Sequence, residues 1–319
     1  MKKITFGRTN VNVSTISLGT WSYGSGNVSG GQPVGWADQS DVDSRAALFQ
    51  AWSSGINHWD TADVYGNGHS EKIIGDVWNE IPRKDIFLAT KVGWGMGGFD
   101  HYYHPKMIKK HIDLSLKNLQ TDVIDLYYFH HCNFDSDTIF EDALDLVHRF
   151  RDKGKIRFIG LSDWDSVKIM QYIDRVNPDV IQPYRNVMDD QYQSSGLKDW
   201  VEKNNAGIAF FSPIKNGLLT GKYDKPPVFK EGDFRLNVPE FQNVELLKKL
   251  QDNKNKLEKK FVNHPQPVLH GLLGALLEDS PTGCVLLGQR DVNQVKAAAE
   301  LGESLTDTDA DWVKTLYKR

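Results

Sequence analysis

Cysteine is scarce in this sequence. Cys132 and Cys284 are its two cysteines, and neither belongs to a Cys-x-x-Cys pair. A disulfide framework or a cysteine-rich zinc site needs more cysteines, or cysteines that are closely spaced. We therefore expect reduced thiols and a cytoplasmic location.

Long apolar runs and an excess of positive charge are also missing. No stretch approaches the roughly 18 apolar residues that span a bilayer, and the start, "MKKITFGRTNVNVSTISLG", has no continuous apolar segment. Lysine and arginine number 38 against 42 acidic residues, a net charge of −4, which does not indicate nucleic-acid binding. We expect a soluble protein that binds small molecules and has no membrane or nucleic-acid partner. The oligomeric state is not indicated.

What the sequence does contain is a regular alternation of strand-like and helix-like segments. Eight short apolar runs read as strands: "STISLG", "GINHWD", "IFLATKV", "VIDLYYFH", "IRFIGLS", "DVIQP", "GIAFFSP" and "GCVLLG". Amphipathic segments lie between most of them. Parallel strands joined by helical crossovers can close into a (β/α)8 TIM barrel, which we predict as one domain over residues 1–319.

Three segments extend this predicted barrel. The run "KKITFGRTNVNVSTISLG" reads as a β-hairpin ahead of the first barrel strand. Residues 223–243 contain prolines and no periodicity, which predicts a long loop after the seventh strand, where such loops often cover a ligand. Residues 244–261 and 268–277 are expected as helices before the eighth strand, and residues 308–319 as a terminal helix.

Polar residues end five consecutive predicted strands, from the second to the sixth. In chain order they are Asp60, Lys91, His130, the neighbours Ser162 and Asp163, and Gln182. Any one of them has an ordinary explanation as a turn residue, a solvated strand end or a satisfied core histidine. Because the carboxyl ends of barrel strands converge on one mouth, their coincidence predicts an active site there.

Tyr65, on the loop after Asp60, completes a predicted proton-transfer group. A phenol has an ordinary pKa of about 10 and donates a proton poorly near neutrality. A buried ammonium at Lys91 would lower the pKa of Tyr65, and Asp60 would compensate and orient that ammonium. His130 would hydrogen-bond the oxygen that receives the proton. Asp63, the second carboxylate of this loop, is expected to structure the loop.

Two patterns match functional motifs only formally. Residues 93–98, "GWGMGG", match a Gly-x-Gly-x-x-Gly fingerprint, but "FDHYYHP" intervenes before the next helical segment, so we interpret them as a mouth loop. His130 and His131 are adjacent on a strand and point to opposite faces, which argues against a shared metal ion. Two alternatives stay open: a metal-dependent barrel hydrolase or isomerase, and a nucleotide-binding sensor or accessory subunit with little turnover.

In these motifs the sequence resembles the aldo-keto reductase superfamily. The matching segments are "GTW", "DTADVYGNGHSE", "ATKVG", "DLYYFH", "IRFIGLS", "VIQP", "FFSPIKNGLLTGKY" and "LLGQRDVNQV", in family order from Gly19 to Val295. The resemblance implies a (β/α)8 barrel that binds NADPH and reversibly reduces an aldehyde or ketone, including sugars. It carries the family's catalytic tetrad over to Asp60, Tyr65, Lys91 and His130.

The resemblance also assigns cofactor contacts. They are Gly19, Thr20, Trp21, Asp60, Ser162, Asp163, Gln182, Phe211, Ser212, Pro213, Ile214, Gly217, Leu218, Gly288, Arg290 and Gln294. Within this set, residues 162, 163 and 182 match carboxamide contacts, residue 211 the ring that stacks on nicotinamide, and residues 212–218 the pyrophosphate segment. Residues 288, 290 and 294 match the group that holds the 2′-phosphate.

Some positions depart from the family pattern. Asp163 stands where asparagine is usual, Phe211 where tyrosine is common, and Ala297 and Ala298 where the family often has an adenine contact. We therefore expect NADPH as the main cofactor and allow use of NADH. Four tryptophans, at positions 21, 36, 94 and 164, fall on predicted mouth loops; lining the cavity, they would favour an apolar aldehyde or a sugar face.

Overall fold

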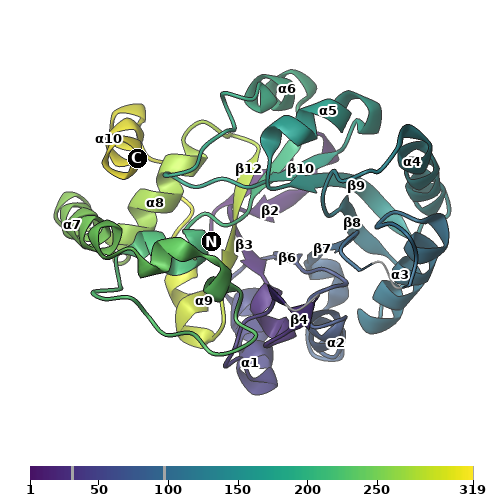
Figure 1. The fold of residues 1–319 in the computed structure, drawn as a ribbon, viewed down its shortest axis with the longest axis horizontal. Helices are drawn as coiled ribbons and strands as arrows, with labels where there is room; N and C mark the ends of the chain where they lie inside the picture. Colours follow the sequence, from purple (N-terminus) through teal and green to yellow (C-terminus); the bar gives the residue numbers. More distant parts are fainter. Residues whose placement is uncertain (30–31, 96–97, 319) are drawn as a thin grey trace.

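Eight parallel strands close into a barrel in the computed structural model, which describes residues 1–29, 32–95 and 98–318 (Figure 1). In chain order the barrel strands are β3 (Ile16–Gly19), β6 (His58–Asp60), β7 (Phe87–Val92), β8 (Ile124–Phe129), β9 (Ile156–Asp163), β10 (Val180–Pro183), β11 (Gly207–Phe210) and β12 (Gly283–Gly288). Each pairs with the next, and β12 pairs with β3, which closes the ring. All eight strands coincide with the predicted ones, so the (β/α)8 prediction is confirmed.

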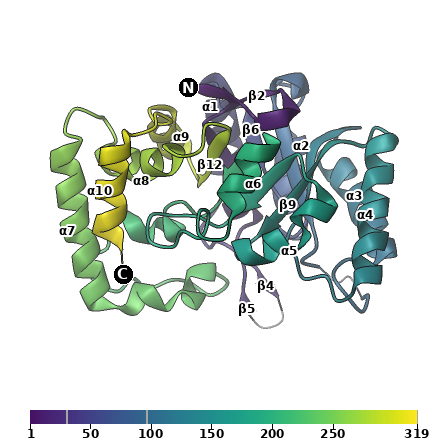
Figure 2. The ribbon, with the colours of Figure 1, turned by 90° about the horizontal axis from the view of Figure 1, so that it is seen from above.

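Helices surround this barrel (Figures 1 and 2). They are α1 (Asp41–Ser53), α2 (His69–Gly75), α3 (Pro105–Asn118), α4 (Asp137–Asp152), α5 (Ser166–Val176), α6 (Leu197–Asn204), α7 (Val244–Lys260), α8 (Pro267–Leu277), α9 (Val292–Ala299) and α10 (Asp307–Tyr317). The helices predicted at 244–261 and 268–277 are confirmed as α7 and α8, and the terminal helix predicted at 308–319 is confirmed as α10 up to Tyr317; residue 319 lies outside the described residues. The helix α9 is not predicted from the sequence. Its eight residues form just over two turns, which is too short for an apolar periodicity to be recognised.

Side-chain caps explain where several of these helices begin. Ser136 accepts a hydrogen bond from the Ile139 N–H at the start of α4, and Asp291 accepts one from the Gln294 N–H at the start of α9. Such caps satisfy N–H groups that have no partner within the helix. Among the described residues, no helix is both long enough and apolar enough to cross a membrane.

An antiparallel hairpin covers the amino ends of the barrel strands. It comprises β1 (Lys3–Thr5) and β2 (Asn12–Ser14), as predicted. Phe6 follows β1 and is fully buried, with its ring 5.7 Å from that of Phe87 inside the barrel. The barrel interior is equally dense at Gly160, where an added Cβ would lie 2.1 Å from the ring of Tyr128. The amino end is thus closed by packed side chains, which leaves the carboxyl end as the open mouth.

Two loops meet over that mouth. The loop after β3 carries a small hairpin of β4 (Val28–Ser29) and β5 (Gln32–Pro33), on the face opposite β1 and β2 (Figure 2). The predicted long loop 223–243 contains two 3-10 turns, Phe234–Asn237 and Pro239–Gln242. The two loops join at a bridge between Gly35 and Asp233, and the Phe234 N–H donates to the Gly35 carbonyl at 2.8 Å.

Candidate active site

Lys91 is the centre of a buried ion pair at the barrel mouth. It lies on β7 with 1 % exposure, and its Nζ donates to the Asp60 carboxylate from the neighbouring strand β6. Nζ also donates to the Thr61 carbonyl at 2.7 Å and to the Tyr65 hydroxyl at 3.4 Å. Burial alone would lower the pKa of Lys91, but Asp60 and Tyr65 raise it above its ordinary value. Lys91 is therefore a charged ammonium group, and its three N–H donors each have an acceptor: Asp60, the Thr61 carbonyl and Tyr65.

Tyr65 is held over this pair by close backbone packing. Gly66 has φ +59°, and a Cβ placed there would lie 2.4 Å from the Gly24 carbonyl oxygen. A Cβ on Gly24 would lie 2.5 Å from the Gly66 nitrogen. Glycine at both positions therefore lets the Tyr65 loop touch the 3-10 turn Trp21–Gly24. In this position the ring of Tyr65 has Lys91 Nζ 5.0 Å from its centroid.

Tyr65 and His130 present complementary protonation states. Burial raises the pKa of the Tyr65 phenol; the Lys91 ammonium lowers it and Asp60 raises it, and the net effect is a raised value. The lowering predicted from Lys91 is thus present, but burial outweighs it, and Tyr65 keeps its proton at neutral pH. Burial, with Lys91 and His131, lowers the pKa of His130 well below its ordinary value, so its imidazole is neutral.

The two rings face the same space. Their centroids are 5.9 Å apart with the planes at 76°. Nδ1 of His130 is buried and has no hydrogen-bond partner within the described part of the chain. Residues 60, 65, 91 and 130 therefore form one cluster, with a phenolic proton donor and a neutral imidazole available to a ligand.

The fifth and sixth strand ends lie beside this cluster. Gln182 on β10 donates from Nε2 to the Asp60 carboxylate at 2.8 Å, which ties it to the ion pair. Ser162 on β9 donates to the Gln182 carbonyl at 2.9 Å. The Asp163 carboxylate, expected to contact the carboxamide, accepts from the backbone N–H groups of Cys132 at 2.7 Å and Asp165 at 2.8 Å. These bonds join the loop after β8 to the loop after β9.

The segment after β11 has an unusual backbone. Ser212, Lys215 and Asn216 have positive φ values of 58°, 46° and 57°, followed by Gly217 at 86°. Positive φ at non-glycine residues is uncommon and clusters at functional sites, and such turns direct N–H groups to one side, as anion sites require. The Ser212 hydroxyl is buried and unpartnered among the described residues. Phe211 precedes this turn, with Trp164 edge-on at 4.8 Å.

The remaining predicted members of this segment are buried or half-buried around the same turn. Pro213, Gly217 and Leu218 are buried, and Ile214 is half-buried with its carbonyl accepting from the Gly217 N–H at 3.0 Å. These residues shape the turn and do not themselves offer charge. The segment as a whole fits an anionic group bound by backbone.

Arg290 already has partners on the opposite loop. Its Nε donates to the Gln39 side chain at 2.9 Å, and one terminal nitrogen donates to the carbonyls of Ala37 and Asp38, both at 2.8 Å. Gln294 accepts from the Arg290 N–H at 3.0 Å, and nothing lies within 4 Å of a Cβ placed on Gly288. The residues predicted to hold a phosphate thus lie close together at the end of β12, with part of the guanidinium bonded to the loop of residues 37–39.

The end of the first barrel strand, β3, and the loop after it pack against the cluster. An added Cβ on Gly19 would lie 3.4 Å from the Leu287 carbonyl oxygen, and Thr20 is buried and donates to the Asp60 carbonyl at 2.9 Å. Trp21 stacks beside Tyr65 with ring centroids 6.1 Å apart and meets Trp36 edge-on at 5.7 Å. Trp94 meets His130 edge-on at 5.9 Å. Aromatic side chains therefore flank both Tyr65 and His130.

The glycine-rich loop after β7 does not have the strand–turn–helix form of a dinucleotide fingerprint. The glycine-rich loop starts at Gly93 and the next helix, α3, starts at Pro105, so no helix opens directly after these glycines; residues 96 and 97 lie outside the described residues. His131 contacts the Gly93 carbonyl through Nε2 at 2.6 Å, away from His130. Within the described ranges, no group of three histidine, cysteine or acidic side chains is placed to hold a metal ion.

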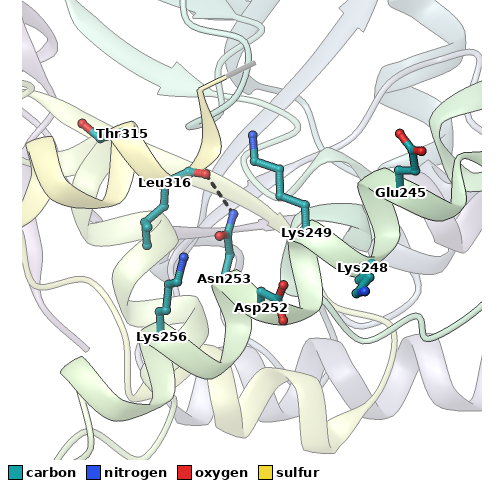
Figure 3. Close-up of a pocket in the computed structure, with 8 residues that line it drawn as sticks. All are labelled: Glu245, Lys248, Lys249, Asp252, Asn253, Lys256, Thr315 and Leu316. Atoms are coloured by element: carbon teal, nitrogen blue, oxygen red, sulfur yellow. Dashed lines mark hydrogen bonds between the residues drawn. The ribbon is translucent and has the colours of Figure 1, made fainter.

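A separate groove of about 520 Å³ lies on the outside of the molecule (Figure 3). It is lined by Thr315 and Leu316 of α10 and by residues of α7, among them Lys248, Lys249 and Lys256. It contains none of the residues predicted for catalysis or cofactor binding. The mouth of the barrel therefore remains the candidate active site.

Comparison with known proteins agrees with this geometry. Residues 15–317 match the model of the Aldo/keto reductase family, which is nearly the whole chain. The chain belongs to the aldo/keto reductase family. It is therefore an NAD(P)H-dependent oxidoreductase, and membership supports the reduction of small carbonyl compounds.

The similar proteins have names that refer to different substrates and cofactors. Aldo-keto reductase YhdN of Bacillus subtilis is 31 % identical over 318 residues, covering 97 % of this chain and 92 % of the relative. The NADH-specific methylglyoxal reductase of Escherichia coli is 28 % identical, with coverages of 99 % and 98 %. A glycerol dehydrogenase from Gluconobacter oxydans superposes with a TM-score of 0.81 at 27 % identity, covering 98 % of this chain and 94 % of that one.

Sequence reasoning missed one part of this region. Asp63, buried on the Tyr65 loop, pairs with His111 of α3, and Glu71 of α2 is 1 % exposed close by. The sequence does not reveal the pairing of His111 with Asp63, because the two residues are 48 positions apart.

Proposed function

We propose that this protein catalyses the reversible reduction of an aldehyde or ketone to an alcohol, with NADPH as the preferred hydride donor and Tyr65 as the general acid. One observation supports this above the others: the Tyr65 hydroxyl lies 3.4 Å from Lys91 Nζ, which is itself paired with buried Asp60. Buried ammonium beside a phenol is the arrangement that stabilises the phenolate left after proton transfer.

The four residues divide the chemistry of the mouth. A bound nicotinamide supplies the hydride. Tyr65 holds the proton at its hydroxyl oxygen and gives it to the substrate oxygen as negative charge develops there, and the neutral His130 ring hydrogen-bonds that oxygen. Lys91 stabilises the phenolate, and Asp60 keeps Lys91 charged. General acid catalysis of this kind contributes about 10² to 10⁴ in rate.

The cofactor-binding residues are proposed from the turn after β11 and from the loop after β12. The buried Ser212 hydroxyl, which has no hydrogen-bond partner among the described residues, and the left-handed backbone from Lys215 to Gly217 suit the pyrophosphate. Phe211 offers a ring for stacking, and Gln182 and Ser162 offer polar groups for the carboxamide. Arg290 suits a 2′-phosphate, since a guanidinium binds such an anion with two parallel hydrogen bonds. We accordingly propose NADPH first and NADH second.

The substrate is proposed to be a small carbonyl compound with an apolar part or a sugar face. Trp21 lies beside Tyr65 and Trp94 beside His130, so aromatic rings flank both groups that would touch the carbonyl oxygen. Aromatic faces pack against apolar groups and against the C–H face of sugars. The reaction would take place in the cytoplasm.

Substitution of Tyr65 by phenylalanine tests the proposal. Absorbance at 340 nm is followed with NADPH and a panel of aldehydes, ketones and aldoses, and NADPH affinity is measured by fluorescence titration. We expect Tyr65→Phe to lose at least about 100-fold in turnover while its affinity for NADPH is retained. The matched control is Tyr172→Phe on α5, half-buried outside the barrel, which should keep full activity.

Other results would redirect the assignment. Undiminished turnover in Tyr65→Phe would contradict its role as the acid. Tight NADPH binding by the unmodified protein without turnover of any panel member would favour a nucleotide-binding sensor. NADPH oxidation that begins only after a divalent metal is added would favour the metal-dependent alternative.

A further inference from the structure

Asp63, on the loop that carries Tyr65, forms a largely buried acid–base pair with His111. Oδ2 of Asp63 lies 2.5 Å from Nδ1 of His111, and their side chains are 6 % and 19 % exposed. His111 comes from α3, whereas Asp63 comes from the loop after β6. The pair therefore joins the catalytic loop to a helix on the outside of the barrel.

The pair holds the loop from its outer side while the strand holds it from the inner side. The Asp63 N–H donates to the Lys91 carbonyl at 3.2 Å, and the Thr61 carbonyl accepts from Lys91 Nζ at 2.7 Å. Two residues later, the Tyr65 N–H donates to the Ala62 carbonyl at 3.1 Å. The side chain of Asp63 thus links the loop to α3, and a movement of the loop away from α3 would break that contact.

The charge of Asp63 needs compensation at this depth. Its other oxygen, Oδ1, is buried and has no hydrogen-bond partner within the described residues. A buried carboxylate with one unsatisfied oxygen is costly unless a cation lies beside it. The hydrogen bond to Asp63 raises the pKa of His111 above its ordinary value. Protonated His111 is the cation that the geometry supplies.

Other charged groups around the pair act on it and on Tyr65. Burial and Lys110 lower the pKa of His111, and Glu71 on α2 raises it. At Tyr65, the charges of Asp60 and Asp63 both raise the phenol's pKa and Lys91 lowers it. Burial, with a contribution from the charge of Asp63, strongly raises the pKa values of two buried phenols, Tyr103 before α3 and Tyr127 on β8, so they stay neutral. Burial and Asp63 raise the pKa of Glu71 to about 7, so Glu71 also changes charge near neutrality. The charges that act on Tyr65 are those of Lys91, Asp60 and Asp63, so the pair reaches the phenol through Asp63.

We propose that the Asp63–His111 pair is a positioning unit for Tyr65: protonated His111 offsets the charge of Asp63 beside the catalytic phenol, and loss of that proton exposes a negative charge that opposes proton release from Tyr65. The proposal rests on the proposed function, since it takes Tyr65 as the general acid. Its consequence is a step in the rate of carbonyl reduction above pH 6.5, falling as His111 loses its proton.

The test is the pH profile of kcat/KM for reduction between pH 5.5 and 9.5, with the aldehyde of the panel that is reduced fastest. In the unmodified protein we expect kcat/KM to fall about three- to tenfold across the step, the effect of one uncompensated charge acting through a partly hydrated site. His111→Gln keeps a donor for Asp63 but lacks the charge, so its profile should lie at the lower level throughout and show no step.

Substitution of the acid distinguishes a charge effect from a structural one. Asp63→Asn should stay at the upper level without a step, and His111→Gln in the Asp63→Asn background should change nothing further. The matched control is His69→Gln, which removes an exposed histidine–aspartate contact of 2.8 Å to Asp41 on the surface. It should leave the step in place.

A second readout does not depend on turnover. The titration of His111 in the NADP⁺-bound protein can be followed by NMR of ¹⁵N-labelled histidines, with His111→Gln identifying its signal. Its midpoint should fall to lower pH in Asp63→Asn. Three results would overturn the inference. They are an unchanged midpoint in Asp63→Asn, a step that persists in His111→Gln, and a loss of rate from His111→Gln that is equal in the unmodified protein and in Asp63→Asn. Full activity of Tyr65→Phe would instead overturn the proposed function itself.

Discussion

Glu71 makes the stability of this protein depend on pH in a direction opposite to that of most carboxylates. It is 1 % exposed on α2, where its two oxygens accept hydrogen bonds from the Thr90 hydroxyl at 2.8 Å and the Asn118 amide at 3.1 Å. Burial and the neighbouring charge of Asp63 raise its pKa from the ordinary 4.5 to about 7, against the lowering effect of these hydrogen bonds. The folded protein therefore binds this proton more tightly than the unfolded chain does.

The size of the effect follows from the two pKa values. A raised pKa stabilises the fold fully below the unfolded value of 4.5, and the contribution is lost as the pH rises through 7. At about 1.4 kcal/mol for each pKa unit, the whole contribution is about 3.5 kcal/mol. Most of it, about 2.5 kcal/mol, should disappear between pH 5 and pH 8.

Glu71→Gln isolates this contribution because glutamine keeps the shape and does not titrate. Urea unfolding at pH 5, 6, 7 and 8, followed by both tryptophan fluorescence and circular dichroism, gives the free energy of unfolding of each protein. The difference between unmodified protein and variant should change by about 2.5 kcal/mol over this range. Glu300→Gln, at an exposed position, is the control and should show no such trend. A difference that is constant with pH would refute the reasoning.

The remaining predictions concern the site. Lys91→Met should lower kcat at least about 100-fold with little change in the Kd for NADPH, because it removes the cation beside Tyr65; normal kcat would rule out that role. Arg290→Ala should weaken NADPH far more than NADH in fluorescence titrations, and equal losses would rule out the 2′-phosphate contact. Gly66→Ala should lower kcat and Tm, since its Cβ would lie 2.4 Å from the Gly24 carbonyl oxygen. Gly154→Ala has a similar positive φ of 71° with nothing within 4 Å, so equal effects of the two substitutions would show that strain alone is responsible.

The barrel, and the clustering of residues 60, 65, 91 and 130, could be predicted because short segments of the sequence carry the information for both. Each strand is a short apolar run, and the tetrad residues stand at strand ends or on the loop directly after one, where the topology brings them together. Asp60 and Lys91 lie on adjacent strands with paired registers, so their contact follows once the barrel is known. The antiparallel hairpin at the amino end followed equally from its own short segment.

Contacts between distant loops could not be predicted in the same way. Arg290 reaches the carbonyls of Ala37 and Asp38, about 250 residues earlier in the chain. The small hairpin β4–β5, and its contact with the loop of Asp233, depend on the course of two long loops. The hydrogen bonds from two backbone N–H groups to the Asp163 carboxylate are likewise set by loop geometry and not by residue type.

The hairpin that closes the amino end of the barrel has a practical consequence for handling the protein. Its strands, Lys3–Thr5 and Asn12–Ser14, lie on the face turned away from the mouth loops (Figure 2). Thr5 and Asn12 are exposed there, and each can be replaced by a cysteine that reacts readily, since Cys132 and Cys284 are buried. A surface-immobilised or dye-labelled molecule attached at this hairpin would keep its mouth facing the solution.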